Sequence, residues 1–205
     1  MIVLSSLALK GVLEKSRREL ERAVGTAFEL RFDATQAILA QLKQGVRADL
    51  LILTTEAMDE LRRNGRVGQV RPLGSSGVGV AVRAGAPKPD IATVDALKRT
   101  LAAASSVAYS KVGASGIYFA GLLERLDVQL KRHVVVEKGP VGEVVAAGGA
   151  ELGVQQLCEL EPVPGIDIVG PLPEPVQKLT HFAAGVTADA GNAPAAWALA
   201  QRLQL

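Results

Sequence analysis

The 205-residue chain has one cysteine, two histidines and 3% aromatic residues, and these shortages exclude several functional classes. Cys158 has no second cysteine with which to form a disulfide, so a disulfide scaffold is excluded. His133 and His181 lie far apart, and neither has a partner ligand at zinc-binding spacing. We therefore expect neither a metal ion nor another cofactor.

The chain also lacks an excess of charge of one sign. It contains 23 lysines and arginines against 21 acidic residues, and the two signs alternate, as in Glu14-Lys15-Ser16-Arg17-Arg18-Glu19. Nucleic-acid-binding domains concentrate basic residues on one surface, and many add aromatic side chains that stack on bases. The sequence therefore predicts no nucleic-acid partner.

Long hydrophobic runs are absent as well. Residues 1–13 are mostly apolar, but Lys10 interrupts them and no basic segment precedes them, as one would in a signal peptide. We expect no membrane insertion and no signal peptide in the chain as it stands, which corresponds to a cytoplasmic protein. A leader outside this sequence would instead make the protein periplasmic.

Three nucleotide and hydrolase motifs are missing. The run Gly74-Ser75-Ser76-Gly77-Val78-Gly79 lacks the order of a dinucleotide-binding fingerprint, and no P-loop sequence occurs. The segment Gly113-Ala114-Ser115-Gly116-Ile117 has isoleucine where a nucleophile elbow requires its second glycine. Neither nucleotide binding nor serine hydrolysis is predicted.

Short apolar runs alternate with longer amphipathic segments along the whole chain. This alternation is typical of an α/β fold with parallel strands. Strands are expected near residues 2–4, 27–32, 49–53, 77–83, 106–109, 133–136, 152–154, 167–169 and 182–186. Helices are expected near residues 9–24, 38–45, 54–61, 94–101, 117–126, 141–147 and 195–203.

Four of the junctions from strand to helix carry small or hydroxylated residues. Helix starts present unpaired backbone N–H groups and a partial positive charge, which suits an oxyanion. A single serine or threonine there is ordinarily only a cap, but four such junctions in one α/β fold indicate an anion site at the strand ends. The junctions are Ser5-Ser6, Ala34-Thr35, Gly113-Ala114-Ser115-Gly116 and Lys138-Gly139-Pro140.

Over nearly its whole length, the chain resembles the substrate-binding proteins of molybdate-type ABC transporters, which have the type II periplasmic-binding-protein fold. The order and spacing of several short segments carry this resemblance. They are Val3-Leu4-Ser5-Ser6-Leu7, Ala48-Asp49-Leu50-Leu51-Ile52, Ala57-Met58-Asp59-Glu60-Leu61, Ser115-Gly116-Ile117-Tyr118 and Gly149-Ala150-Glu151-Leu152-Gly153-Val154.

The resemblance implies two α/β lobes, each with a mainly parallel sheet flanked by helices. Two crossover strands, near residues 77–83 and 179–184, would join them. Lobe I would comprise residues 1–80 and 180–205, and lobe II residues 81–179. In this family the ligand lies in the cleft between the lobes, and the hinge closes on it.

The resemblance also implies which residues contact the ligand. The family presents a tyrosine where this chain has Gln155-Gln156, whose amides both donate and accept hydrogen bonds. This difference, with Asp33 and Lys138 nearby, makes a small organic acid as suitable a ligand as molybdate. The implied contacts are Ser5, Ser6, Ala34, Thr35, Ala114, Ser115, Gly116, Lys138, Gly139, Gln155 and Gln156.

Three functions fit this pattern. The leading hypothesis is a binding protein for a small anion, with an ABC transporter permease as its partner if the protein is exported. The alternative is a cytoplasmic isomerase of a small polycarboxylate, similar to aconitate isomerase; Asp33, Tyr118, Lys138 and Glu143 are its available acid–base types, and no catalytic residue is assigned. The third is an effector-sensing domain, which would need a separate DNA-binding partner because no helix-turn-helix precedes the first strand.

Overall fold

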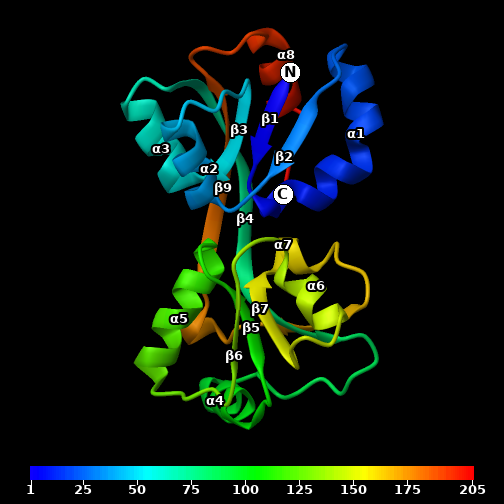
Figure 1. The fold of residues 1–205 in the computed structure, drawn as a ribbon, viewed down its shortest axis with the longest axis vertical. Helices are drawn as coiled ribbons and strands as arrows, with labels where there is room; N and C mark the ends of the chain where they lie inside the picture. The colour runs from blue at the N-terminus through cyan, green and yellow to red at the C-terminus, as the bar shows by residue number, and fades with distance from the viewer. The chain divides into compact units, whose positions relative to one another are not determined.

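The computed structural model describes residues 1–205 and divides into two compact units (Figure 1). Unit 1 consists of Met1–Ser75 and Thr180–Leu205, and unit 2 consists of Ser76–Leu179. The chain passes from one unit to the other within strands β4 (Val67–Arg83) and β9 (Leu179–Thr187). The first passage, at Ser75–Ser76, lies five residues before the expected lobe boundary at residue 80.

The sheet of unit 1 has three parallel strands, β1 (Ile2–Ser5), β2 (Glu29–Phe32) and β3 (Leu50–Thr54). The strand order is β2-β1-β3-β9-β4, with β9 antiparallel to β3. Because Ser5 is in register with both Phe32 and Ile52, the carboxyl ends of the three parallel strands lie at one edge.

The helices of unit 1 cover both faces of its sheet. They are α1 (Lys10–Val24), which follows a 3-10 turn at Leu7–Leu9, α2 (Thr35–Lys43), α3 (Thr55–Arg63) and α8 (Ala193–Ala200). In Figure 1, α2 and α3 lie on one side of the strands and α1 on the other, where it contacts α8. The alternation of strand side chains therefore supplies two apolar faces, with Leu4, Leu51 and Leu53 packed towards α2 and α3.

The sheet of unit 2 is built around β5 (Val107–Ser110), which is parallel to β6 (His133–Val136) and β7 (Leu152–Gln156). The second part of β4 is antiparallel to β7 on one side and to β8 (Ile166–Pro171) on the other. Each sheet is therefore mixed, with three parallel strands together at one side, which matches the expected α/β class.

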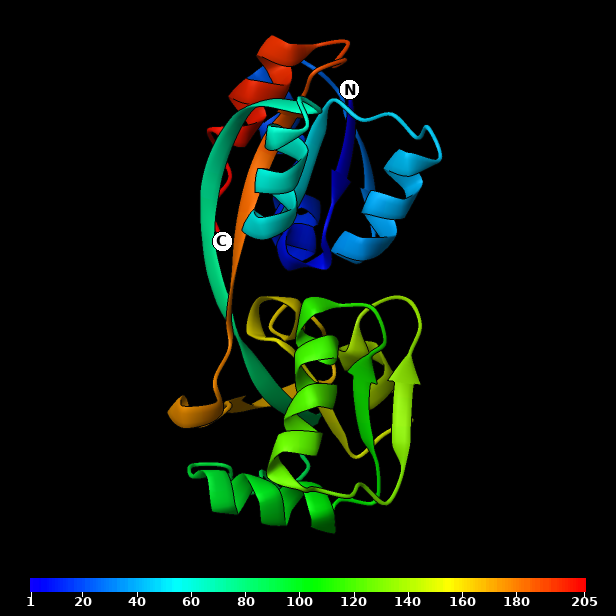
Figure 2. The same cartoon turned by 90° about the vertical axis from the view of Figure 1, so that its left-hand side faces the viewer.

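The helices of unit 2 are α4 (Val94–Ala103), α5 (Ala114–Leu126), α6 (Val141–Ala146) and α7 (Leu157–Leu160), and a 3-10 turn spans Glu174–Val176. Figure 2 shows α5 lying alongside β5 and β6. On that face Val107, Tyr109 and Phe119 share one buried cluster. On the opposite face Ala108 packs against Val141 and Val145 of α6.

Two elements differ from the sequence prediction. Strand β4 begins at Val67, ten residues before the expected start at Gly77. Among the first eight residues of β4 only Val67 and Leu73 are buried, and the segment contains Pro72. This part of the strand therefore lacks the alternation of apolar and polar residues by which a strand is predicted. Helix α7 was not expected at all, because four residues are too few to show a helical period.

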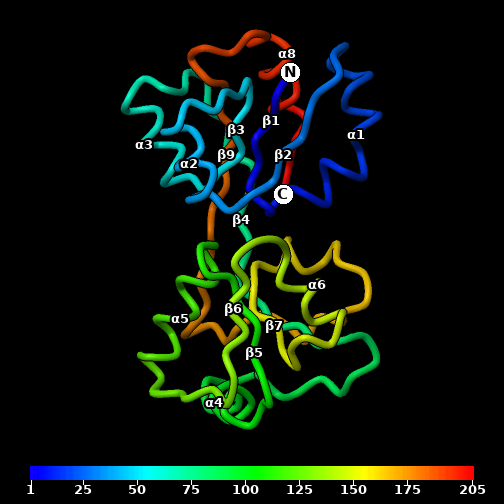
Figure 3. The backbone as a smooth tube through the Cα atoms, viewed as in Figure 1, coloured from blue at the N-terminus to red at the C-terminus, as the bar shows by residue number.

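Both chain termini lie in unit 1 (Figure 3). The last residue, Leu205, donates its backbone N–H to the carbonyl oxygen of Leu73 in β4 (2.9 Å). None of the helices has the length and apolar character needed to cross a membrane.

The Asp49 carboxylate accepts hydrogen bonds from two backbone segments of unit 1. It accepts N–H hydrogen bonds from Ile2 (2.6 Å), Gly191 (2.7 Å) and Asn192 (3.2 Å). Burial by itself would raise the pKa of Asp49, but these three hydrogen bonds outweigh it and hold the pKa below its usual value. The charged side chain therefore fixes the start of β1 to the loop before α8.

We expect Asp49→Ala to lower the free energy of unfolding by about 2–3 kcal/mol at neutral pH, because three N–H groups lose a charged acceptor. Asp59→Ala, which removes an exposed carboxylate on α3, should change it by less than about 0.5 kcal/mol. The pKa of Asp49 is lowered by folding, so its stabilisation is present above the ordinary aspartate pKa of about 3.9 and is lost as pH falls through the lower folded value. Urea unfolding from acidic to neutral pH measures both effects, and equal losses in the two variants would contradict this role.

Candidate functional site

The strand ends of unit 1 bring Ser5, Ser6, Ala34 and Thr35 to one edge of its sheet. Backbone hydrogen bonds hold this edge together: Ser6 donates to the carbonyl oxygen of Ile52 (2.7 Å), and Asp33 donates to that of Ser5 (3.1 Å). The parallel register places the residues after β1, β2 and β3 next to one another.

The two serines after β1 differ in how their hydroxyl groups are used. Ser5 is fully buried, and its Oγ donates to the carbonyl oxygen of Ser6 (2.8 Å). Ser6 is 3% exposed, and its buried Oγ has no hydrogen-bond partner in the protein. Because an unpaired buried hydroxyl is costly and rare in native proteins, Ser6 is the stronger candidate for donating to a ligand.

The start of α2 carries the Thr35 hydroxyl and lies next to the Asp33 carboxylate. Thr35 is buried, and its Oγ1 accepts a hydrogen bond from the backbone N–H of Thr54 (3.4 Å), so its own proton can be donated elsewhere. The N–H of Ala34 donates to Asp33 Oδ1 (2.9 Å), while Asp33 Oδ2 accepts from Gln41 Nε2 (3.1 Å). Both oxygens of the Asp33 carboxylate are therefore engaged within the protein, just before α2 begins.

Thr54 was not among the expected ligand contacts, and the structure places it beside Thr35. It is the last residue of β3 and the residue before α3. Its side chain makes no capping hydrogen bond, and its N–H is the group that meets Thr35. A hydroxyl at the end of a parallel strand is the sequence signal that could have placed it in the site.

In unit 2, the start of α5 packs directly on the end of β5. Ser110, the last residue of β5, accepts the N–H of Gly113 through its Oγ (2.9 Å). Ser115 and Gly116 are both buried in the first turn of α5, whereas Ala114 is exposed. A Cβ on Gly116 would lie 1.8 Å from the carbonyl oxygen of Ser110, so only glycine permits this close approach.

The start of α6 is capped from within unit 2. Lys138 is exposed, Gly139 has a positive φ of +88°, and α6 begins at Val141. The N–H of Val141 donates to Gln155 Oε1 (2.8 Å), and Gln155 Nε2 donates to the Glu159 carboxylate. Gln155 therefore uses both ends of its amide inside the protein, although the sequence suggested it as a ligand contact.

This edge also includes Gln156, Cys158 and Glu159, which follow Gln155 in the chain. Gln156 is 1% exposed, ends β7 and precedes α7. Burial raises the pKa of the Cys158 thiol to about 12, so it is not a thiolate nucleophile near neutral pH. Removal from water raises the pKa of Glu159 to about 7, although the hydrogen bond from Gln155 opposes the rise. Glu159 was not among the expected site residues.

The acid–base types named from the sequence have other surroundings. The Tyr118 hydroxyl donates to the carbonyl oxygen of Val176 (2.8 Å) and accepts from Arg125 (3.0 Å). Lys138 and Glu143 are exposed. These contacts give Tyr118 a structural role and leave Lys138 and Glu143 in solvent.

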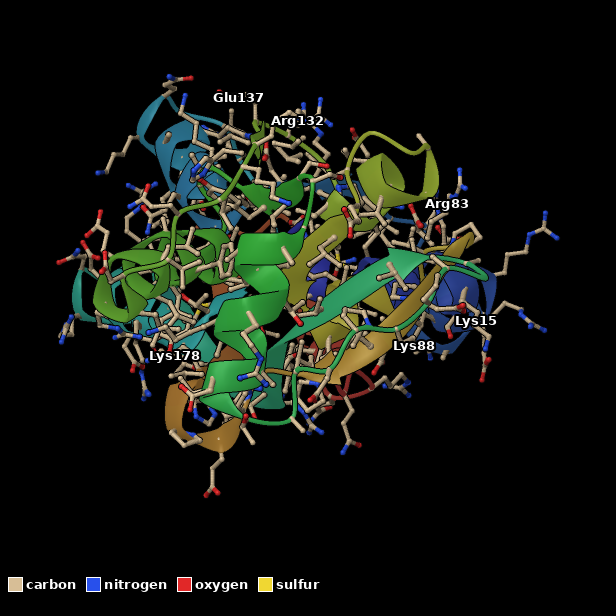
Figure 4. All side chains as sticks on the ribbon, turned by 90° about the horizontal axis from the view of Figure 1, so that it is seen from below. Lys15, Arg83, Lys88, Arg132, Glu137 and Lys178 are labelled. Atoms are coloured by element: carbon tan, nitrogen blue, oxygen red, sulfur yellow. The ribbon has the colours of Figure 1, made fainter.

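Most charged side chains lie on the surface and are dispersed. Figure 4 shows Arg132 and Glu137 pointing outward from the ribbon, and Glu137 forms an exposed ion pair with Lys111 (2.9 Å). No group of three or more histidine, cysteine, aspartate or glutamate side chains is arranged to hold a metal ion. The polar groups at the strand ends therefore remain the best candidate site in each unit.

A family model described as "Bacterial extracellular solute-binding protein" matches residues 2–204. The chain belongs to this family. The match covers both units, so the two strand-end edges described above are parts of a solute-binding fold.

Individual relatives differ in their named roles. A protein named aconitate isomerase, from a Pseudomonas species, is 39% identical over 99% of this chain and 81% of its own length. The Azotobacter vinelandii periplasmic molybdate-binding protein has a TM-score of 0.75 at 20% identity, covering 98% of this chain and 91% of its own. The substrate-binding domain of a molybdenum ABC transporter from Clostridium difficile has a TM-score of 0.66 at 16% identity, covering 98% and 90%. The two structures show that the fold is of the type II periplasmic-binding-protein kind.

Two glycines of α5 provide a test of the close approach at its start. We expect Gly116→Ala to lower the free energy of unfolding by about 2 kcal/mol or more, because the new Cβ collides with the Ser110 carbonyl oxygen. Gly121→Ala has open space and should raise it by about 0.5–1 kcal/mol, as alanine favours the helix. Urea unfolding compares the two variants, and a neutral Gly116→Ala would show that α5 does not need this contact.

Proposed function

We propose that this protein binds a small oxyanion or organic acid through polar groups at the strand ends of both units. The observation that carries the proposal is the buried, unpaired Ser6 hydroxyl at the edge where Thr35 and Thr54 also lie. Hydroxyl and backbone N–H donors at such an edge hold an anion without needing a positive charge beside it.

In unit 2, Ser115 and Gln156 are the polar residues that lie at the strand ends. Both are buried, each stands at the carboxyl end of a strand or in the first turn of the helix that follows, and each can donate a hydrogen bond.

Within this ligand class we favour a di- or tricarboxylate. Glutamine at position 156 offers both a donor and an acceptor, which suits a carboxylic acid with hydroxyl or carboxyl groups better than a tetrahedral oxyanion. The 39% identity to a protein named aconitate isomerase supports the same choice. If the protein is exported, an ABC transporter permease is the partner that would receive the ligand.

Thermal unfolding against citrate, trans-aconitate, malonate, sulfate, phosphate and molybdate tests the proposal. A ligand that binds only the folded protein raises its melting temperature. We expect at least one carboxylate to do so, and we expect Ser6→Ala, Thr35→Val and Ser115→Ala each to weaken its binding about three- to tenfold.

Ser16→Ala on α1 is the matched control, since it removes a hydroxyl away from the strand ends and should leave affinity unchanged. If none of the anions shifts the melting temperature, the proposed function is wrong. Equal effects of Ser16→Ala and Ser6→Ala would show that the strand-end hydroxyls do not form the site.

The second candidate function is isomerisation of a polycarboxylate, favoured by the relative named aconitate isomerase. Moving a double bond along such an acid requires a base to remove a proton from carbon and donors to stabilise the negative charge that develops. The strand-end hydroxyls could supply the donors. Asp33 and Tyr118 are engaged in hydrogen bonds with the protein, which weakens their case as the base.

Incubation with cis- and trans-aconitate in D2O, followed by proton NMR, separates the two functions. From the binding proposal we expect neither interconversion nor deuterium uptake above a heat-unfolded control. Interconversion with deuterium at the shifted carbon, abolished by Ser6→Ala, would instead establish the isomerase and show that binding is only its first step.

A further inference from the structure

A chain of two side-chain hydrogen bonds connects α6, β7 and α7 in unit 2. The N–H of Val141, the first residue of α6, donates to Gln155 Oε1 (2.8 Å). Gln155 Nε2 then donates to Glu159 Oε2. Gln155 is 1% exposed and Val141 is fully buried, so the first of these bonds is shielded from water.

The backbone fixes the direction of this chain. Val141 N–H can only donate, so the Gln155 oxygen must face it and the Gln155 nitrogen must face Glu159. If the Gln155 amide were flipped, its NH2 group would face the N–H of Val141, and two donors would oppose each other. Glu159 must therefore present an acceptor, which both its charged form and the carbonyl oxygen of its neutral form can do.

Tight packing makes the position of α6 depend on this chain. A Cβ on Gly153 of β7 would lie 2.6 Å from Val145 Cγ2, so α6 rests directly on the β7 backbone. The residue after Gln155 is Gln156, a proposed ligand contact, and its backbone is held in register with Val78 of β4. A change at Gln155 therefore acts on the strand end that carries Gln156.

We propose that Gln155 and Glu159 are positioning residues that hold α6 and Gln156 in place for anion binding, and that protonation of Glu159 tunes this binding. The inference rests on the proposed function and assigns Gln155 a supporting role instead of a direct ligand contact. It also gives the site a pH dependence near neutrality that does not come from a histidine.

The charged surroundings of Glu159 are sparse. Helix α7 packs against α6, β7 and β8. Among the titratable residues of these elements, Glu143 of α6 is exposed, and Asp167 of β8 accepts the N–H of Gly85. Within α7, Cys158 stays neutral, and Glu161, which directly follows α7, is exposed. The pKa of Glu159, about 7, is set by removal from water against the single hydrogen bond from Gln155.

The experiment compares the full-length wild type with Glu159→Gln, which keeps a neutral acceptor, and Glu159→Leu, which has none. The first readout needs no ligand: the assigned Val141 amide resonance is followed by NMR between about pH 5.5 and 8.5. We expect a titration near pH 7 in the wild type and none in Glu159→Gln.

The second readout is citrate affinity by calorimetry, expressed as the ratio of wild type to Glu159→Gln at each pH, because this ratio cancels the titration of citrate itself. We expect a ratio of dissociation constants near one at about pH 5.5. The wild type should bind about threefold or more weakly at about pH 8.5, where charged Glu159 opposes the anion. At every pH, Glu159→Leu should bind citrate at least about fivefold more weakly than Glu159→Gln, since Gln155 Nε2 loses its acceptor.

Stability supplies a check that does not depend on the ligand. Folding raises the pKa of Glu159 from about 4.5 to about 7, so its favourable contribution is complete below about 4.5 and is lost as pH rises to about 7. Glu159→Gln has no group that titrates in this way. As pH rises over this range, its free energy of unfolding should therefore increase relative to that of the wild type.

The outcomes separate the two proposals. A Val141 amide without a titration near pH 7, or a Glu159→Leu variant that binds citrate as well as Glu159→Gln, overturns the positioning role. Failure of citrate and all the other tested anions to bind overturns the proposed function and with it the tuning of binding. A Val141 titration then still supports the hydrogen-bond chain, because it is measured without ligand.

Discussion

The register of the parallel strands is the constraint on which the candidate site depends. In unit 1, the pairing of Ser5 with both Phe32 and Ile52 makes three strands end at the same edge. In unit 2, the pairing of Ser110 with Val136 and of Tyr109 with Val154 does the same. Hydrogen bonding between strands therefore gathers short polar segments that are distant in sequence, and a slip of one residue would turn them to other faces.

At these edges, existing hydrogen bonds distinguish structural groups from groups that can bind a ligand. Asp33 and Gln155 are polar and well placed, yet their hydrogen-bonding atoms are already engaged by groups of the protein. The Ser6 hydroxyl is buried and unpaired. The cost of leaving such a group unsatisfied is what makes Ser6, and not the more conspicuous charged residues, the centre of the proposal.

Proteins with this fold carry different named functions. A molybdate-binding protein and a substrate-binding domain of a molybdenum transporter share the fold at 20% and 16% identity, whereas the relative at 39% identity is named as an isomerase. Binding and isomerisation of an anion both need donors aimed at negative charge, and they differ in whether a base reaches a carbon-bound proton. The same strand-end hydroxyls would serve either function.

The sequence by itself determined the α/β class, most of the strands and helices, and the junctions at which small and hydroxylated residues gather, because periodicity and helix-start chemistry are local. It missed the first part of β4, whose exposed residues and Pro72 mask the strand pattern, and it missed helix α7. Only the tertiary structure decided that Gln155 caps Val141 from fourteen residues away, that burial raises the pKa of Glu159, and that Ser6 stays unpaired. Burial and hydrogen-bond partners depend on what packs around a residue, and no local pattern contains that information.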